Sequence, residues 1–325
     1  MNRRCFLGCV LASPGILPLR TARANDQPVR VGWLTAQRPS SLEPYIAAFR
    51  QGLAEQGLEE GRNLTIEYRY GNDDLSRVPD LANQLAKAEV AVILAQGAAV
   101  TVLSKLNLPI PVIYAFSGDP VSAGLASSYA RPSRNMTGVT FMAAELNKKR
   151  LEFLREIVPG LRRVALIGNP EHPGEQLERS VSLDAGRQFD LSIDYYPTKT
   201  SDALTDAFTR LAADPPQALS VFADGFTLQN RVRLIDFANQ LRIPVISGWP
   251  VFAQAGAICT YGPRLTECYR RLAAYLSRVT KGEQPGSIPI ERPATFELVL
   301  NLKAAKALGI NVPASVLALA DQVIE

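Results

Sequence analysis

Residues suited to catalytic chemistry are few and scattered in this chain. Its 325 residues include a single histidine, His172, in a Pro-Glu-His-Pro loop. One histidine without neighbouring cysteines excludes the usual zinc ligand sets, and no Gly-x-Ser-x-Gly elbow is present to hold a serine as a nucleophile. We therefore expect His172 to be a solvent-exposed loop residue, with contact to a ligand at the rim of a site as the alternative.

The motifs that bind nucleotides and phosphates are also missing. The sequence contains no G-x-x-x-x-G-K-[ST] phosphate loop, and the turn after its first predicted strand, residues 32–37 (GWLTAQ), lacks G-x-G-x-x-G. The carboxylate pair Asp73 and Asp74 follows Gly71, which favours a solvated turn. With no evident acid, base or nucleophile, the sequence predicts a binding protein rather than an enzyme, with no cofactor and no metal.

Polar residues suited to binding follow two apolar runs. Residues 90–95 and 110–115 are rich in β-branched side chains and are separated by a helix-length segment, which predicts buried parallel strands joined by a crossover. The first run is followed by Gln-Gly-Ala at 96–98, and the second by Ser-Gly-Asp at 117–119. In open parallel sheets ligands lie at the carboxyl ends of the strands, so these two strand ends form the first candidate site.

The same order of elements starts again in the second half. Apolar strands are predicted near residues 163–168, 218–223 and 243–247, and the sequence IPVI at 110–113 recurs at 243–246. Strands that alternate with helices in both halves predict an α/β protein with two doubly wound parallel-sheet lobes. The candidate ligand-binding residues, all at predicted strand ends, are Gln37, Gln96, Gly97, Ala98, Ser117, Gly118, Asp119, Asp224, Phe226, Trp249 and Tyr261.

Several of these residues also have a purely structural explanation. Asp119 precedes Pro120, so it could cap a helix that is predicted to begin there. Gln96 could bond its own loop, Trp249 could serve packing alone, and Tyr261 could belong to the connection between the lobes. The chain is expected to finish in a short helix within residues 313–324.

The first 24 residues read as an export signal and not as part of the fold. Residues 2–7 (NRRCFL) resemble a twin-arginine signal, with a Sec signal as the alternative, and Ala-Arg-Ala at 22–24 fits a cleavage site. The segment contains four arginines and no acid, so the rest of the chain has 31 basic and 31 acidic residues. This neutral balance offers no overall field for nucleic acid. We expect the protein to be exported to the periplasm.

Two cysteines, Cys259 and Cys268, lie beyond this leader. In an oxidising compartment a disulfide between them is one interpretation. The interpretation we favour is two buried thiols, one on a strand and one on a helix.

Long stretches of the chain resemble a known protein family. Residues 117–140 (SGDPVSAGLASSYARPSRNMTGVT), 149–170 (KRLEFLREIVPGLRRVALIGNP) and 296–325 (FELVLNLKAAKALGINVPASVLALADQVIE) resemble bacterial ABC-transporter substrate-binding proteins, and residues 249–291 fit them too. The resemblance covers essentially the whole mature chain. It is to the branch that includes aromatic amino-acid binders, distinct from the branched-chain amino-acid binders, and it implies the type I periplasmic-binding-protein fold.

The resemblance implies two lobes that close over a ligand by a three-segment hinge. One lobe would comprise residues 29–140 and 264–290, and the other residues 141–263 and 291–325. The chain would cross between them near residues 140–146, near residues 261–264 and near residues 291–295.

Two ligand loops depart from the aromatic amino-acid binders of this family. Gly118 replaces a polar residue, and Asp224 is followed by Gly225 where those members have an Asp-Asn pair. No lysine or arginine falls on a strand end, so a strongly acidic ligand is not expected. The resemblance therefore implies a small organic ligand (an amino acid, an aromatic compound or a related small acid) without fixing which.

Three functions are compatible with these observations. The leader, the neutral charge and the duplicated halves favour the exported solute-binding component of an ABC importer, a monomer that passes a small molecule to a membrane permease and binds no nucleic acid. A ligand-sensing module that signals to a membrane partner would use the same fold. An enzyme would need Asp119 and Asp224 to face each other across the cleft.

Overall fold

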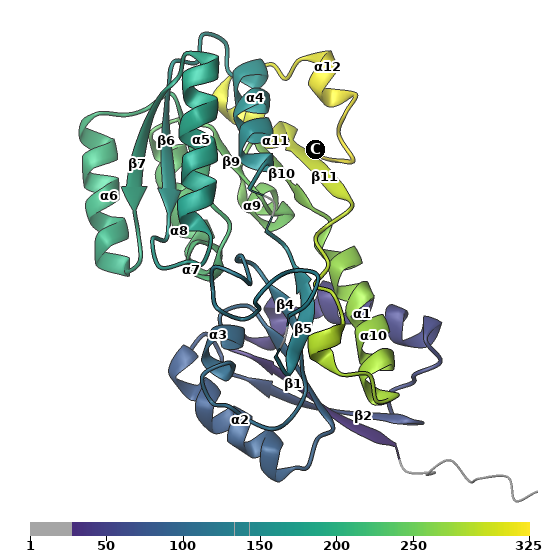
Figure 1. Cartoon of the computed structure of the whole chain (residues 1–325). Helices are drawn as coiled ribbons and strands as arrows, with labels where there is room; N and C mark the ends of the chain where they lie inside the picture. Colours follow the sequence, from purple (N-terminus) through teal and green to yellow (C-terminus); the bar gives the residue numbers. More distant parts are fainter. Residues whose placement is uncertain (1–27, 133, 143) are drawn as a thin grey trace, which may run out of the picture.

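Two mainly parallel sheets, each covered by helices, divide the molecule into two lobes (Figure 1). The structure, a computed structural model, describes residues 28–132, 134–142 and 144–325. The predicted leader, residues 1–24, lies outside the described residues. The α/β class and the two-lobed arrangement predicted from the sequence are confirmed.

The first lobe contains a five-stranded sheet in the order β2-β1-β3-β4-β5, in which every pairing is parallel. Its strands are β1 (Val29–Thr35), β2 (Leu64–Tyr70), β3 (Val92–Gln96), β4 (Val112–Phe116) and β5 (Met136–Thr140). Helices α2 (Val78–Lys87) and α3 (Ala99–Leu103) cover one face, and α1 (Glu43–Glu55) and α10 (Leu265–Thr280) cover the other. Strands β3 and β4 are buried at every position because both faces are covered.

The second lobe contains a seven-stranded sheet in the order β12-β11-β10-β9-β8-β6-β7. Its strands are β6 (Arg163–Gly168), β7 (Ser192–Pro197), β8 (Ala218–Val221), β9 (Val245–Ser247), β10 (Cys259–Pro263), β11 (Phe296–Asn301) and β12 (Gln322–Ile324). Its helices are α4 (Leu146–Ile157), α5 (Glu175–Phe189), α6 (Ser201–Ala213), α7 (Gly225–Gln229), α8 (Arg231–Gln240), α9 (Pro250–Ala255), α11 (Leu302–Leu308) and α12 (Ala314–Leu317). The sheet is mixed because β11 runs antiparallel to β10, while the other pairings are parallel.

Three segments connect the lobes, and hydrogen bonds hold them side by side. The chain leaves the first sheet after β5, returns after β10 to form α10, and crosses again before β11. The N–H of Thr140 donates to the carbonyl of Glu291 at 3.0 Å, and the N–H of Arg264 donates to the carbonyl of Thr295 at 3.0 Å. The third segment therefore pairs with both of the others.

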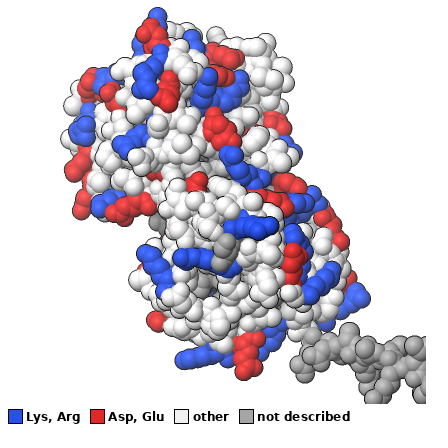
Figure 2. Space-filling view, viewed as in Figure 1, with Lys and Arg blue, Asp and Glu red and all other residues white. Residues whose placement is uncertain are grey.

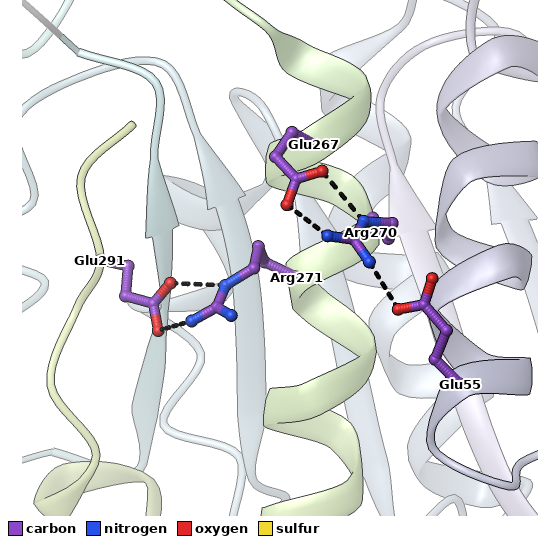
Figure 3. A network of polar contacts seen from close by, with 5 residues as sticks. All are labelled: Glu55, Glu267, Arg270, Arg271 and Glu291. Carbon is purple, nitrogen blue, oxygen red and sulfur yellow. Dashed lines mark hydrogen bonds and ion pairs between the residues drawn. The ribbon is translucent and has the colours of Figure 1, made fainter. Parts of the chain in front are cut away.

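Ion pairs fix α10 against its neighbours in the first lobe (Figure 3). Arg270 donates to Glu55 of α1 at 2.6 Å and to Glu267 of its own helix at 2.7 Å. Arg271 donates two hydrogen bonds to Glu291, at 2.9 and 2.6 Å. Such partly exposed pairs each contribute little stability; they join α10 to α1 and to the third crossing segment at the surface.

Two expected helices differ from the structure. After Asp119 the chain forms turns instead of a helix, because it folds back so that the N–H of Leu125 bonds the carbonyl of Pro120 at 2.8 Å. Near the end of the chain, α12 is a single turn, and the last residues form β12 because they pair with β11. In the second case the pairing with β11 overrides the local helix signal, whereas the turns after Asp119 are closed by a local hydrogen bond.

The two cysteines are buried free thiols, Cys259 on β10 and Cys268 on α10. This confirms the favoured interpretation and excludes a disulfide in this structure. Within the described ranges, no helix is long and apolar enough to span a bilayer. On the face seen in Figure 2, acidic and basic side chains are interspersed over both lobes.

Candidate functional site

A cavity of about 570 Å³ lies between the lobes, at the carboxyl ends of strands from both sheets. The residues that follow β1, β3 and β4 form one wall, and those that follow β6, β8 and β9 form the other. Eight of the eleven predicted residues line it: Gln37, Gln96, Gly97, Ala98, Ser117, Asp224, Phe226 and Trp249. Tertiary structure thus brings strand ends from the two halves of the chain into one site.

Asp119 is not on the cavity wall, because its own loop uses its carboxylate. Its Oδ1 accepts hydrogen bonds from the N–H groups of Val121 at 2.7 Å and Ser122 at 2.8 Å, and its Oδ2 accepts one from the hydroxyl of Tyr129 at 3.2 Å. Asp119 therefore has a structural role, but it closes the turns of its own loop and does not cap a helix as predicted. A pair of carboxylates formed by Asp119 and Asp224 across the cleft is not found.

Gly118 and Tyr261 also lie off the cavity wall. Gly118 packs on the loop of the second lobe, where an added Cβ would come within 2.4 Å of the carbonyl oxygen of Pro173. Tyr261 packs inside the second lobe against Phe153 and Phe296, with ring centroids 5.2 and 6.4 Å away. Gly118 serves close approach of the lobes, and Tyr261 serves packing beside a crossing segment.

Thr35, which the sequence analysis missed, organises the wall of the first lobe. Its hydroxyl donates to Oε1 of Gln96 at 2.6 Å and accepts from the N–H of Gln37 at 3.1 Å. Both Thr35 and Gln96 are buried. The side-chain carbonyl oxygen of Gln96 is thereby bonded to the end of β1, and the side chain of Gln96 also hydrogen-bonds that of Tyr269 on α10. Thr35 is the last residue of β1, so the rule used for the other strand ends would have found it.

Asp224 is 2% exposed and caps α7 with one of its two carboxylate oxygens. Oδ1 accepts from the N–H of Phe226 at 2.6 Å and of Thr227 at 3.0 Å, whereas Oδ2 is buried without a hydrogen-bond partner. The pKa of Asp224 is raised to about 7, chiefly by burial and to a smaller extent by the charge of Glu178, against the lowering effect of the facing N–H groups of Thr227, Phe226 and Asn169.

His172 lines the cavity and is half-buried, so the expectation of a solvent-exposed loop residue is wrong. Its Nε2 lies 3.0 Å from Oγ of Ser117. The contact joins the two lobes, because Ser117 follows β4 and His172 follows β6. Burial lowers the pKa of His172 to about 4, so the imidazole is neutral at neutral pH. The position of His172 in the loop after β6 could have predicted its place on the cavity wall, but the search for catalytic motifs did not use this position.

Four aromatic side chains contribute to the cavity wall. Phe226 and Trp249 come from the second lobe, as predicted, and Phe116 and Phe141 come from the first lobe and its crossing segment. The sequence analysis missed the latter two, since a phenylalanine at the end of an apolar run reads as core. The wall thus offers flat apolar surfaces on both sides, the environment that favours a ring-bearing ligand.

Charged residues are sparse on the wall, and most of them are paired. The carboxylate of Asp73 forms an ion pair with Arg38, and that of Glu171 accepts from Lys199 at 2.8 Å. Among the described residues that line the cavity, Lys105 is the single lysine or arginine, and it is exposed. Among the described lining residues, Asp224 is the carboxylate with a buried oxygen that has no hydrogen-bond partner.

The contact between Ser117 and His172 is the feature nearest to catalytic chemistry. A nucleophilic serine needs a basic imidazole oriented by a third group. A pKa of about 4 makes His172 a poor base, and within the described residues no carboxylate hydrogen-bonds its ring. The described part of the chain also contains no group of three or more His, Cys, Asp or Glu able to hold a metal ion. The arrangement is suited to binding.

Two α/β lobes with a ligand-sized cavity between them define a solute-binding protein of the periplasmic-binding-protein type. Residues 37–324 match the family described as ABC transporter substrate binding protein. The chain belongs to this family, which is non-enzymatic, and is the substrate-binding component of an ABC transporter.

Relatives agree with this assignment. A curated tyrosine-binding protein of Clostridioides difficile is 21% identical over 273 residues, which cover 83% of this chain and 78% of the relative. A solved domain from Streptococcus pneumoniae in complex with L-Trp superposes with a TM-score of 0.84 at 20% identity, covering 92% of this chain and 100% of that one. A conserved domain protein of Vibrio cholerae gives a TM-score of 0.83 at 22% identity, covering 91% and 100%.

Proposed function

We propose that this protein, after export to the periplasm, captures an aromatic amino acid between its lobes and delivers it to the permease of an ABC importer. The observation that carries the proposal is the buried, unpartnered Oδ2 of Asp224 on the cavity wall. A desolvated carboxylate oxygen without a partner is costly. An ammonium group supplies both the hydrogen-bond donor and the opposite charge that this oxygen lacks.

The remainder of the wall supports an aromatic zwitterion. The rings of Phe116, Phe141, Phe226 and Trp249 offer stacking surfaces. The carboxylate of an amino acid would meet neutral donors and Lys105 at the mouth, in keeping with the absence of an arginine clamp among the described lining residues. The binding properties named for the Clostridioides difficile and Streptococcus pneumoniae relatives point to the same ligand class.

Titration calorimetry tests the proposal with amino acids and their deaminated analogues. L-Tyrosine and L-tryptophan are expected to bind, and 3-(4-hydroxyphenyl)propionic and 3-indolepropionic acid, which lack the amine, are expected to bind roughly 10- to 100-fold more weakly. In Asp224→Asn the side-chain oxygen can still cap α7, but the charge is lost. The affinity of this variant for the amino acids should therefore fall by a similar factor.

Asp119→Asn is the matched control, because Asp119 also accepts two backbone N–H groups at a strand end but lies off the wall. It should leave binding unchanged. Equal affinity for the amino acids and their deaminated analogues would contradict the role of Asp224. Failure of every aromatic amino acid to bind would contradict the ligand class.

A further inference from the structure

A second residue of the cavity wall, on the opposite lobe, also has a buried side-chain acceptor without a partner. Among the lining residues that the structure describes, two have a buried side-chain atom without a hydrogen-bond partner: Gln37 through Oε1 and Asp224 through Oδ2. Both atoms are acceptors, and they belong to different sheets. A buried acceptor left unpaired costs more than the net gain of an ordinary hydrogen bond, so each one calls for a donor from the ligand.

Gln37 is held in place on both sides of its position in the chain. Its own N–H donates to Oγ1 of Thr35 at 3.1 Å. The preceding carbonyl, of Ala36, accepts from the N–H of Asp73 at 2.7 Å, and the following residue, Arg38, forms an ion pair with the carboxylate of Asp73. The loop after β1 is therefore anchored to the loop after β2, and the side chain of Gln37 starts from a fixed backbone.

We infer that Gln37 is a specificity-determining residue that selects a ligand carrying a second hydrogen-bond donor, an O–H or N–H on its aromatic ring. This inference rests on the proposed function, in which Asp224 takes the ammonium group. With the ammonium held by the second lobe, the remaining acceptor, on the first lobe, is left for the other end of the ligand. A phenol or an indole carries such a donor, and a plain phenyl ring does not.

The size of the expected selection follows from hydrogen bonding and not from volume. A site that hydrogen-bonds a ligand hydroxyl rejects the analogue without it far more strongly than an apolar pocket distinguishes two similar shapes. Loss of one bond to a buried neutral acceptor corresponds to roughly 10- to 100-fold in affinity. L-Phenylalanine should therefore bind more weakly than L-tyrosine and L-tryptophan by about this factor.

The test is calorimetry with L-tyrosine, L-tryptophan and L-phenylalanine on the wild-type protein, Gln37→Met and Gln229→Met. Methionine has a length similar to glutamine and only a weak acceptor. In Gln37→Met the affinity for tyrosine and tryptophan should fall toward that for phenylalanine, which should itself stay level or rise. Gln229→Met is the matched control, because Gln229 lines the rim, is exposed and has no buried unpaired atom; its selectivity should equal that of the wild type.

Thermal unfolding without ligand separates recognition from a structural role. Removal of an unpaired acceptor should leave the Tm of Gln37→Met unchanged or raise it, and a lowered Tm would overturn the inference. Equal binding of phenylalanine and tyrosine by the wild-type protein would also overturn it, while leaving the proposed aromatic amino acid class intact. If none of the three amino acids binds, the proposed function fails and the inference fails with it.

Discussion

At the residue scale, Asp224 divides its carboxylate between two tasks. One oxygen caps α7 through the N–H groups of Phe226 and Thr227, and the other is buried without a partner and, in the proposed function, accepts from the ligand. The cap fixes the orientation of the side chain before a ligand arrives, which reduces the ordering needed on binding. The price is a buried carboxylate whose pKa is raised to about 7.

We predict that affinity for an ammonium-bearing ligand falls as pH decreases below about 7. Protonated Asp224 cannot pair with the ammonium group, so each pH unit below its pKa costs up to about tenfold. Calorimetry at about pH 6 and about pH 8.5 should show the difference, with protons released on binding near pH 7. Asp224→Asn should bind weakly at both values. An affinity that is flat across this range in the wild type would contradict the raised pKa.

We predict that the contribution of Asp224 to the stability of the ligand-free protein decreases as pH rises, whereas ligand affinity increases. Because the folded pKa of Asp224 exceeds its unfolded value, its contribution to stability is present below about pH 4 and is lost as pH rises through about 7. His172 has a lowered pKa, so its contribution is present above about pH 6.5 and is lost as pH falls toward 4. Urea unfolding of the wild type and of Asp224→Asn between about pH 6.5 and pH 8 measures how much of the change in unfolding free energy with pH comes from Asp224. This part of the change should be absent in the variant.

At the element scale, close packing of α1 on α10 holds the returning helix in the first lobe. Gly52 lies at this contact, where an added Cβ would come within 2.2 Å of the carbonyl oxygen of Arg270 and 3.0 Å of Cβ of Ala273. The obstacle is backbone and cannot rotate away. The ion pair of Arg270 with Glu55 joins the same two helices at the surface (Figure 3).

We predict that Gly52→Ala destabilises the protein by about 1–3 kcal/mol through overpacking. In an isolated helix the same change would stabilise by about 1 kcal/mol. A destabilised variant would therefore show that the close contact with α10 outweighs the gain in helix propensity. Urea unfolding measures it. Gln51→Ala, an exposed position on the same helix, is the control and should stay within about 0.5 kcal/mol. A stabilised Gly52→Ala would mean that the two helices separate easily.

At the scale of the whole molecule, direct contacts join the loops of the two lobes beside the cavity. Ser117 and His172 are hydrogen-bonded at 3.0 Å, and the N–H of Asp119 donates to the carbonyl of Pro173 at 3.1 Å. Gly118 lies between these contacts and allows the loops to approach. Because the lobes are otherwise joined by three paired segments, these contacts favour a closed arrangement of the lobes.

We predict that Ser117→Ala increases the radius of gyration of the ligand-free protein in small-angle scattering and lowers ligand affinity roughly 2- to 10-fold, the worth of one neutral hydrogen bond. The ligand-saturated profile should match that of the wild type. Ser104→Ala is the control, because Ser104 also lines the cavity but donates within its own lobe, to the carbonyl of Thr101. An unchanged ligand-free profile would show that the contact does not hold the lobes together.

The two-lobed α/β fold and most residues of the cavity wall could be predicted from the amino-acid sequence. Apolar runs such as β3 and β4 can only be buried strands between covering helices, and parallel strands must end at one edge, so Gln96, Ser117 and Asp224 were predictable as wall residues. The burial of Cys259 and Cys268 as free thiols followed from their places on a strand and a helix.

Contacts between distant parts of the chain set which strand ends line the cavity and which serve the fold. Asp119 and Asp224 have the same local signal, a carboxylate after a strand, and both cap backbone N–H groups. They differ because the hydroxyl of Tyr129 takes the second oxygen of Asp119, whereas that of Asp224 is left unpaired. His172 likewise is half-buried and neutral because the fold covers it, and its hydrogen-bond partner Ser117 lies 55 positions away in the sequence. Hydrogen bonding and burial are set by neighbours distant in the sequence, so no local pattern could supply them.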